Sequence, residues 1–276
     1  MKKIKISVSD LFVCVFTCCI LGATIIGCSK VPITNRHQVI AIAESHMIAM
    51  SVKNYSEFLA KNPPLPNTDN RVVMVKKVGT KIQMAVEQFM KDKKLSNRIS
   101  GYKWEFNVVN DDKTVNAWCM PGGKVVVYTG LFPITLTEAG LAVVMGHEIA
   151  HAVARHGNER MSQAMIAQYG KKALATAVSV TTPGAQDIFM QSYGIGSTLG
   201  LLKYSRVHES EADKLGLVFM AMAGYNPEEA ITFWERMAKS GGGSTMQMLS
   251  THPSDETRIA DLKKFLPKAK QYYKPK

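Results

Sequence analysis

Residues 147–151 read His-Glu-Ile-Ala-His, and this stretch predicts the centre of the fold. On a helix, residues i and i+4 share one face, so His147 and His151 can bind one cation together. Glu148 lies beside that face, where its carboxylate can take a proton from water. Neutral imidazole suits zinc, which lowers the pKa of its water to about 7 when one ligand position is open. The apolar run Leu141–Met145 predicts a mostly buried helix. Taken alone, the motif also fits two core histidines paired by chance.

A second group of residues, in the stretch 205–216, makes a chance match less probable. Glu209 and Asp213 are again spaced i and i+4, so they share a helix face. A catalytic zinc site with two histidines needs a third protein ligand, and glutamate is a known choice. Metal-bound histidine usually donates its second N–H to a carboxylate or carbonyl. Glu209 is therefore the expected third ligand and Asp213 the group that orients a histidine. The alternative is an ordinary acidic helix face.

Three neighbouring side chains are predicted to lie outside the metal site. On a continuous helix Glu211 points about 200° from Glu209, so we expect it to face solvent. His208 is adjacent to Glu209 but off its face, and it is not expected to bind the ion. His156 falls about 140° from His151 on the same assumption, and it is not expected to bind zinc either.

At these residues the sequence resembles the M48 metallopeptidases, in particular the branch of periplasmic Oma1-like lipoproteins. The resemblance covers roughly residues 30–265. It rests on the order HExxH, then about 58 residues, then Glu-x-x-x-Asp. Three further strings match: Val31-Pro32-Ile33-Thr34-Asn35-Arg36, the segment from Val115 to Gly123, and Thr251-His252-Pro253 followed by Arg258. Asn35 stands where glycine is common in the family.

The resemblance implies a gluzincin with an α+β fold. Its domain would be mostly helical and zincin-like, with a small antiparallel sheet before the catalytic helix. One zinc ion per chain would be held by His147, His151 and Glu209, with Glu148 as the general base of peptide hydrolysis.

The segment Asn116-Ala117-Trp118 is a candidate substrate-binding strand. Its edge could pair with an extended substrate through main-chain hydrogen bonds. The alternative is a core strand with no contact to substrate.

Two residues late in the chain are further candidates. His252 follows a Gly-rich loop, Ser240 to Ser244, and could reach the open zinc position as a latch or donate to the developing oxyanion. Its alternative role is structural, as a histidine before Pro253. Arg258 is a candidate for pairing with Asp213 or for touching the substrate.

The first 28 residues are typical of an exported bacterial lipoprotein. A basic start, Met1–Lys5, precedes an uncharged apolar run from Leu11 to Ile26, which suits a signal peptide. The ending Ile25-Ile26-Gly27-Cys28 resembles a lipobox, whose cysteine becomes lipidated. Ser29 in place of aspartate favours the outer membrane, facing the periplasm. The alternatives are a plain signal peptide or an N-terminal anchor helix.

The remaining sequence divides by its patterns into a leader (1–27), a segment with the lipidated Cys28, a connector and a helix (28–69), and a peptidase domain (70–276). Predicted helices span 36–60 and 70–95, predicted strands lie within 102–109, 115–120 and 124–128, and the chain is helical from Thr137 onward. Cys119 is the free thiol of the mature body.

Composition limits the kind of partner. The net charge is +12, but the Lys and Arg residues are scattered and form no dense block with interleaved aromatics. A solvated basic surface is therefore favoured over nucleic-acid binding.

The motifs favour a lipid-anchored zinc endopeptidase of the cell envelope, and the resemblance implies that it acts on misfolded or stalled envelope proteins. Two alternatives belong to other classes. The first is an envelope chaperone or assembly factor whose protease action is secondary or latched. The second is a structural zinc protein, against which Glu148 argues because a structural site has no use for a general base.

Overall fold

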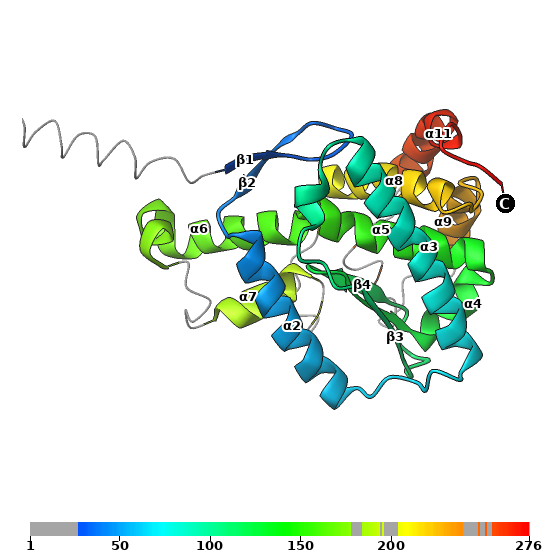
Figure 1. Cartoon of the computed structure of the whole chain (residues 1–276), viewed down its shortest axis with the longest axis horizontal. Coiled ribbons are helices and arrows are strands. Elements are labelled where there is room, and N and C mark those ends of the chain that lie inside the picture. The colour runs from blue at the N-terminus through cyan, green and yellow to red at the C-terminus, as the bar shows by residue number, and fades with distance from the viewer. Residues whose placement is uncertain are drawn as a thin grey trace, which may run out of the picture.

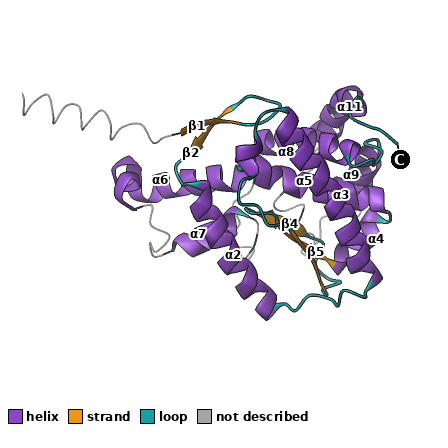
Figure 2. Cartoon of the chain, viewed as in Figure 1, coloured by secondary structure: helices purple, strands orange, loops and turns teal. Residues whose placement is uncertain are grey.

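A computed structural model describes residues 27–177, 184–193, 195, 204–239, 248, 252 and 256–275. The predicted leader thus lies outside the described residues apart from Gly27, and so does the Gly-rich loop 240–244. The rest forms a mostly helical α+β domain with small sheets, which confirms the predicted fold class (Figure 2). Within the described part of the chain, no helix is both long and apolar enough to cross a membrane.

The helix α5 (Glu138–Ala154) carries the His-Glu-Ile-Ala-His motif through the middle of the domain (Figure 1). Thr137 caps its start, because the Thr137 hydroxyl accepts a hydrogen bond from the backbone N–H of Gly140 at 3.1 Å. Every residue from Gly140 to Ala154 is buried. A helix that is buried on all sides has a fixed position, and so do the side chains that it carries.

The helix α8 (Arg206–Met222) carries the predicted acidic residues and crosses α5 at two glycines. A Cβ atom placed on Gly216 would lie 3.0 Å from the backbone nitrogen of His147, closer than packed side chains allow. A Cβ atom on Gly146 would lie 3.1 Å from the carbonyl oxygen of Gly216. The two backbones therefore touch, and this contact holds the acidic turn of α8 against the histidines of α5.

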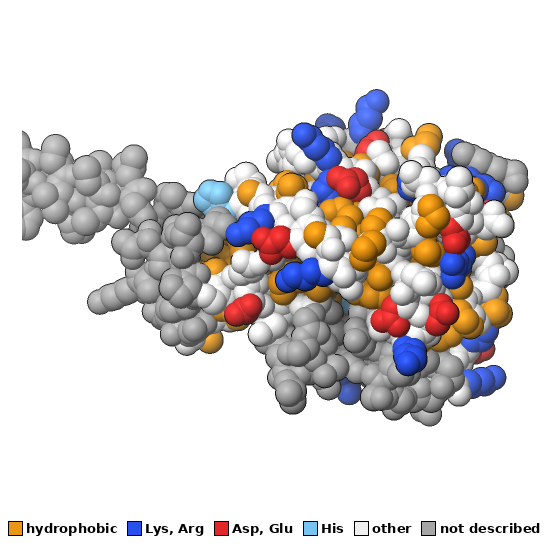
Figure 3. Space-filling view, turned by 90° about the horizontal axis from the view of Figure 1, so that it is seen from below, with side chains coloured by type: hydrophobic (Ala, Val, Ile, Leu, Met, Phe, Trp, Pro, Cys, Tyr) orange, Lys and Arg blue, Asp and Glu red, His pale blue; other side chains and the backbone are white. Residues whose placement is uncertain are grey.

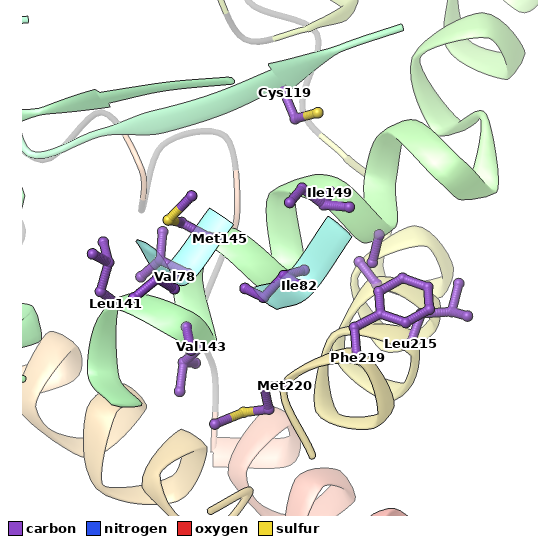
Figure 4. Packing of buried hydrophobic residues seen from close by; sticks show 14 of the residues in the cluster. Val78, Ile82, Cys119, Leu141, Val143, Met145, Ile149, Leu215, Phe219 and Met220 are labelled. Carbon is purple, nitrogen blue, oxygen red and sulfur yellow. The ribbon is translucent and has the colours of Figure 1, made fainter. Parts of the chain in front are cut away.

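The main hydrophobic core lies between α5, α8 and α3 (Asn70–Asp92), whose predicted span 70–95 is confirmed to within a few residues. Figure 4 shows side chains of the three helices gathered in one cluster, with Val78 and Ile82 of α3 near Leu141 of α5 and Phe219 of α8. Cys119 reaches the same cluster from the sheet and is a buried free thiol. This packing fixes the face of α5 opposite the sheet.

The sheet has three strands, β3 (Glu105–Val109), β5 (Lys124–Tyr128) and β4 (Ala117–Met120), in the order β3-β5-β4. β4 and β5 are antiparallel and joined by a turn in which Gly122 and Gly123 have φ of 83° and 79°. The expectation of an antiparallel sheet is wrong for β3, which pairs with β5 in parallel. The cause is the order: β5 lies between β3 and β4, so successive strands β3 and β4 are not neighbours.

The N-terminal part differs from the predicted helix 36–60. The helix α2 (Glu44–Lys61) begins later, because residues 37–40 form the strand β2 (His37–Ile40). β2 pairs antiparallel with β1 (Gly27–Lys30) to give a small hairpin. Gln38 is buried and donates a hydrogen bond to the carbonyl oxygen of Ala154 at 2.8 Å, so a polar residue points inward. A strand that buries glutamine lacks the apolar alternation by which strands are predicted.

The remaining elements complete the domain, and helices dominate after Thr137 as predicted. They are η1 (Ser96–Ile99), η2 (Thr129–Leu131), α4 (Phe132–Thr135), α6 (His156–Ala177), α7 (Ala185–Ser192), α9 (Glu229–Lys239) and α11 (Glu256–Lys270).

On the face seen in Figure 3, Lys and Arg side chains lie among Asp and Glu side chains.

Candidate metal centre

Four side chains from three parts of the chain converge beside α5. His147 and His151 lie one helical turn apart, and their Nε2 atoms are 3.0 Å from each other. α8 supplies Glu209, and the segment between α9 and α11 supplies His252. All four are buried, and one ligand atom from each lies within 4.8 Å of the others. The structure thus brings together the three predicted ligands and the predicted active-site histidine.

The spacing of these atoms fits a tetrahedral zinc ion. Ligand atoms about 2.1 Å from such an ion lie about 3.4 Å from one another. The Nε2 atoms of His147 and His151 lie 3.4 and 3.3 Å from the two oxygens of Glu209. Nδ1 of His252 lies 3.2 Å from Nε2 of His147 and 2.9 Å from Oε1 of Glu209. These distances are equal to that edge or shorter than it, and those to Glu209 involve both of its oxygens, so the donors can close around one ion after small shifts.

The ionisation of the donors also suits a cation. Burial lowers the pKa of His151 well below its usual range, so the ring is neutral and has a lone pair to give. Burial acts to raise the pKa of Glu209, but His252 and His147 outweigh this effect and lower the pKa well below its usual value. Burial and Arg258 act to lower the pKa of His147, but Asp213 and Glu209 outweigh them and raise it. A metal ion bound beside the anionic Glu209 would displace that proton from His147, since ligands must be deprotonated to bind.

Asp213 contacts His147 as the sequence analysis expects of an orienting group. Its Oδ1 lies 2.9 Å from Nδ1 of His147, so the ring donates its Nδ1–H and keeps Nε2 free for an ion. Arg258 holds Asp213 in turn, with Nε and Nη2 donating to the carboxylate at 2.9 and 2.6 Å. Arg258 also lies 3.1 Å from Glu209 and stacks on Trp234. The predicted pairing of Arg258 with Asp213 is therefore observed, alongside its contacts with Glu209 and Trp234, and a contact with substrate stays a prediction.

Glu148 lies at the rim of the four-residue cluster. Burial raises the pKa of its carboxyl to about 7, in the range where a group can both take and give a proton. Its Oε1 is buried and, among the described residues, has no hydrogen-bond partner; Nε2 of His252 is 3.6 Å away. A buried carboxylate oxygen without a donor is costly, and such atoms are characteristic of reactive sites.

Two residues that the sequence analysis excludes prove to support the cluster. His156 is fully buried, and its Nδ1 lies 3.0 Å from Nδ1 of His151. His156 is not among the metal donors, as predicted, but the predicted angle of about 140° does not describe where its ring lies. The helix α5 ends at Arg155, whose φ of 62° is left-handed, and α6 begins at the next residue. Burial lowers the pKa of His156 to about 4, so its ring is neutral.

Glu211 was expected to face solvent, and this is wrong because it is 2% exposed. The side of α8 opposite Glu209 is covered by the segment 31–36. The Glu211 carboxylate lies 3.1 Å from Nε2 of His156. Burial acts to raise the pKa of Glu211, but hydrogen bonds from His156 and Arg36 lower it to about 2. Glu211 and Arg36 both lie in strings that resemble the M48 family. The strings mark both residues in the sequence, but they do not show that the two side chains contact each other.

His208 and the predicted substrate strand lie beside the cluster. Nε2 of His208 lies 3.1 Å from Glu159 rather than among the metal donors. β4 is an edge strand of the described sheet, while the side chains of Asn116, Ala117 and Trp118 are buried. The Trp118 ring packs edge-on against Phe58 of α2 at 5.0 Å. Main-chain pairing of a substrate with β4 stays a prediction.

A buried helix with two histidines one turn apart, a glutamate between them and a third ligand from a following helix defines a metallopeptidase. Comparison with known proteins agrees: the model of peptidase family M48 matches residues 76–266. The chain belongs to this family and is a metalloendopeptidase.

Similar proteins include mitochondrial metalloendopeptidases and bacterial assembly-enhancing proteases. The mitochondrial metalloendopeptidase OMA1 of Saccharomyces cerevisiae is 35% identical over 88% of this chain and 70% of the yeast protein. Human OMA1 is 28% identical over 86% of this chain and 46% of its own length. The β-barrel assembly-enhancing protease of Escherichia coli is 29% identical over 57% of this chain and 33% of its own length. The chain thus spans less than half of the human and bacterial relatives.

The contact between Asp213 and His147 gives a first prediction. In Asp213→Asn the carboxylate that accepts from Nδ1 of His147 loses its charge, and we expect zinc affinity to fall about 10- to 100-fold. Competition with a chromogenic zinc chelator measures this. Asp92→Asn, an exposed change in α3, is the control and should bind zinc like the unchanged protein. Equal affinity in the two variants would show that Asp213 does not support the ligand.

Proposed function

We propose that this metalloendopeptidase uses one zinc ion per chain, held by His147, His151 and Glu209, and cleaves misfolded or stalled proteins of a bacterial cell envelope. The observation that carries the proposal is the convergence of the buried donors of His147, His151 and Glu209 directly beside the carboxylate of Glu148. A structural zinc site is closed by four protein ligands and needs no base. The buried carboxylate of Glu148, with an oxygen that accepts from no described donor, favours catalysis.

The residues divide the work of peptide hydrolysis among them. A zinc ion in this site would polarise the substrate carbonyl and acidify water. The Glu148 carboxylate takes the proton of the attacking water and passes it to the departing amine, for which its pKa near 7 is suited. Asp213 keeps Nδ1 of His147 protonated, so that Nε2 remains a donor to the ion.

Glu148→Gln tests the enzyme directly. The amide is close in shape but cannot accept a proton, so we expect casein cleavage to fall by about 10²- to 10⁴-fold. Zinc content should stay at one ion per chain, because Glu148 is not a ligand. Metal analysis and peptide release on the full chain in detergent measure both. An unchanged protein that neither binds zinc nor cleaves casein would contradict the proposal.

The envelope location rests on the sequence and on one relative. The basic start, the apolar run and the ending Ile25-Ile26-Gly27-Cys28 support lipidation of Cys28, and Ser29 supports the outer membrane. The Escherichia coli relative is named for enhancing β-barrel assembly, and such barrels belong to the outer membrane of bacteria. An acylated cysteine gains about 0.8 kcal/mol for each buried CH₂, so two or more chains hold a protein firmly at the bilayer.

Cys28→Ala tests the anchor. In bacterial cells we expect the variant to lose incorporation of radiolabelled fatty acid and to leave the membrane fraction. Cys19→Ala, inside the apolar run, is the matched control and should stay lipidated. Equal labelling of the two variants would exclude Cys28 as the acceptor.

His252 favours a second candidate function, an envelope chaperone or assembly factor whose protease action is latched or secondary. Its Nδ1 lies 3.2 Å from Nε2 of His147 and 2.9 Å from Glu209, which is the distance of a fourth ligand. A histidine at that place would occupy the position that hydrolysis needs open. In this case the Glu148→Gln variant would still rescue client proteins in cells, whereas loss of all function would favour the protease.

His252→Ala distinguishes a His252 that closes the fourth ligand position from one that donates to the oxyanion. If His252 closes the fourth position, its removal should raise casein cleavage several-fold while three ligands retain the zinc. A fall in cleavage would instead indicate a donor to the oxyanion. His46→Ala, an exposed change in α2, should leave the rate unchanged. A His252→Ala rate equal to that control would place His252 outside the reaction.

A further inference from the structure

The N-terminal hairpin packs onto the metal centre from outside the matched peptidase region. The hairpin β1–β2 and the turn between its strands precede residues 76–266, which the family model matches. Figure 1 shows the hairpin beside α6 and α8, on the far side of the molecule from α4. Its turn contributes Thr34 and Arg36 to a buried group of acidic side chains.

Arg36 joins two buried carboxylates that would otherwise repel each other. Its Nη1 and Nη2 donate to Glu159 at 2.7 Å each, and its Nε and Nη2 donate to Glu211 at 3.0 and 2.9 Å. The hydroxyl of Thr34 donates to the same Glu211 carboxylate at 2.6 Å. A planar guanidinium can grip two carboxylates in this way, and a point charge cannot. The hairpin therefore fixes where Glu211 lies.

Glu211 in turn sets the proton positions of two histidines. A carboxylate only accepts, so Nε2 of His156 carries a proton and donates it to Glu211 at 3.1 Å. A neutral ring then has a bare Nδ1, which accepts from Nδ1–H of His151 at 3.0 Å. With its proton on Nδ1, His151 presents the lone pair of Nε2 to the ion.

We propose that the hairpin β1–β2 and its turn position a metal-binding histidine, His151. Thr34 and Arg36 hold Glu211 in place. Glu211, acting through His156, fixes the tautomer and the ring orientation of His151. All four are positioning residues that do not touch the ion or the substrate. This inference rests on the proposed zinc site and adds to it a support that is drawn from the N-terminal end of the described chain.

Further hydrogen bonds hold the hairpin to the end of α5, directly after His151. Gln38 donates to the carbonyl oxygen of Ala154 at 2.8 Å and to Glu159 at 3.0 Å. Arg98 donates to the same carbonyl and to the Gln38 side chain at 2.9 Å each. The carbonyls at a helix C-terminus lack partners within the helix. Here Gln38 of the hairpin and Arg98 of η1 both donate to the carbonyl oxygen of Ala154. A shift of the hairpin would thus move both Glu211 and the end of α5.

The experiment measures metal affinity rather than catalysis. The full chain in detergent is stripped of metal and titrated with zinc against a chromogenic chelator. For Glu211→Gln and for His156→Gln we expect zinc affinity to fall about 10- to 100-fold, the usual effect of losing a partner of a metal-bound histidine. Thr34→Val, which removes one hydroxyl, should lower it by a smaller factor. When these variants are loaded with Co(II) in place of zinc, their visible absorption bands should differ from those of the Co(II)-loaded unchanged protein.

A matched pair of arginines separates positioning from general stability. Arg36 and Arg236 have similar exposure, at 28% and 31%, and each forms an ion pair at 2.7 Å with a glutamate. Arg36→Gln should lower zinc affinity and alter the Co(II) spectrum, whereas Arg236→Gln should change neither. Arg36→Lys keeps the positive charge but lacks the planar guanidinium with its several donors. Its zinc affinity should therefore lie between those of Arg36→Gln and the unchanged protein.

The possible outcomes distinguish this inference from the proposed function. If the unchanged protein binds no zinc, the zinc site itself is wrong and the inference falls with it. If the unchanged protein binds zinc and all the hairpin and relay variants bind it equally, the inference alone is overturned. If Arg36→Gln and Arg236→Gln weaken zinc binding to the same extent, in step with their melting temperatures, the hairpin is only a stabilising element. Thr34→Val, the mildest change, covers the case in which a charged variant fails to fold.

Discussion

The structure depends on the burial of three carboxylates on one helix. Glu209, Glu211 and Asp213 are 4%, 2% and 8% exposed, and a charge that is removed from water costs several kcal/mol unless it is paired. Their partners come from opposite ends of the chain. Arg258 of α11 compensates Asp213 and Glu209, and Arg36 of the hairpin compensates Glu211. Electrostatic compensation therefore draws both ends of the described chain onto α8.

The glycine contact between α5 and α8 decides what these charges can do. Because Gly146 and Gly216 let the two backbones touch, Glu209 and Asp213 lie within 3.4 Å of nitrogen atoms of His147. A wider crossing would still bury the acidic turn, but the carboxylates would then miss the imidazole rings. The close contact at the two glycines thus brings the carboxylates of α8 near enough to the histidines of α5 to take part in a metal site.

Spacing along one helix predicts which side chains share a face, but not what covers the other faces of that helix. Glu209 and Asp213 were recognised because i and i+4 spacing survives folding unchanged. His156 lies outside the group of metal donors, as predicted, but helical spacing across the break at Arg155 does not reveal its contact with His151. Glu211 was misplaced because its partners lie about 175 residues earlier, in a hairpin whose buried residue is polar. The parallel pairing of β3 with β5 was missed for a similar reason, since strand order depends on contacts distant in sequence.

The two metal-binding histidines receive different support, and together these supports determine what the site binds. Asp213 accepts from Nδ1 of His147 directly, while Glu211 acts on His151 through His156. Both Nδ1 atoms then carry protons, and the bare Nε2 atoms face each other at 3.0 Å. In these tautomers the two lone pairs would repel each other at that distance, and a cation bound to both nitrogens would remove the repulsion. The hydrogen bonds around the site therefore favour the binding of a divalent metal ion, as expected where metal binding is coupled to folding.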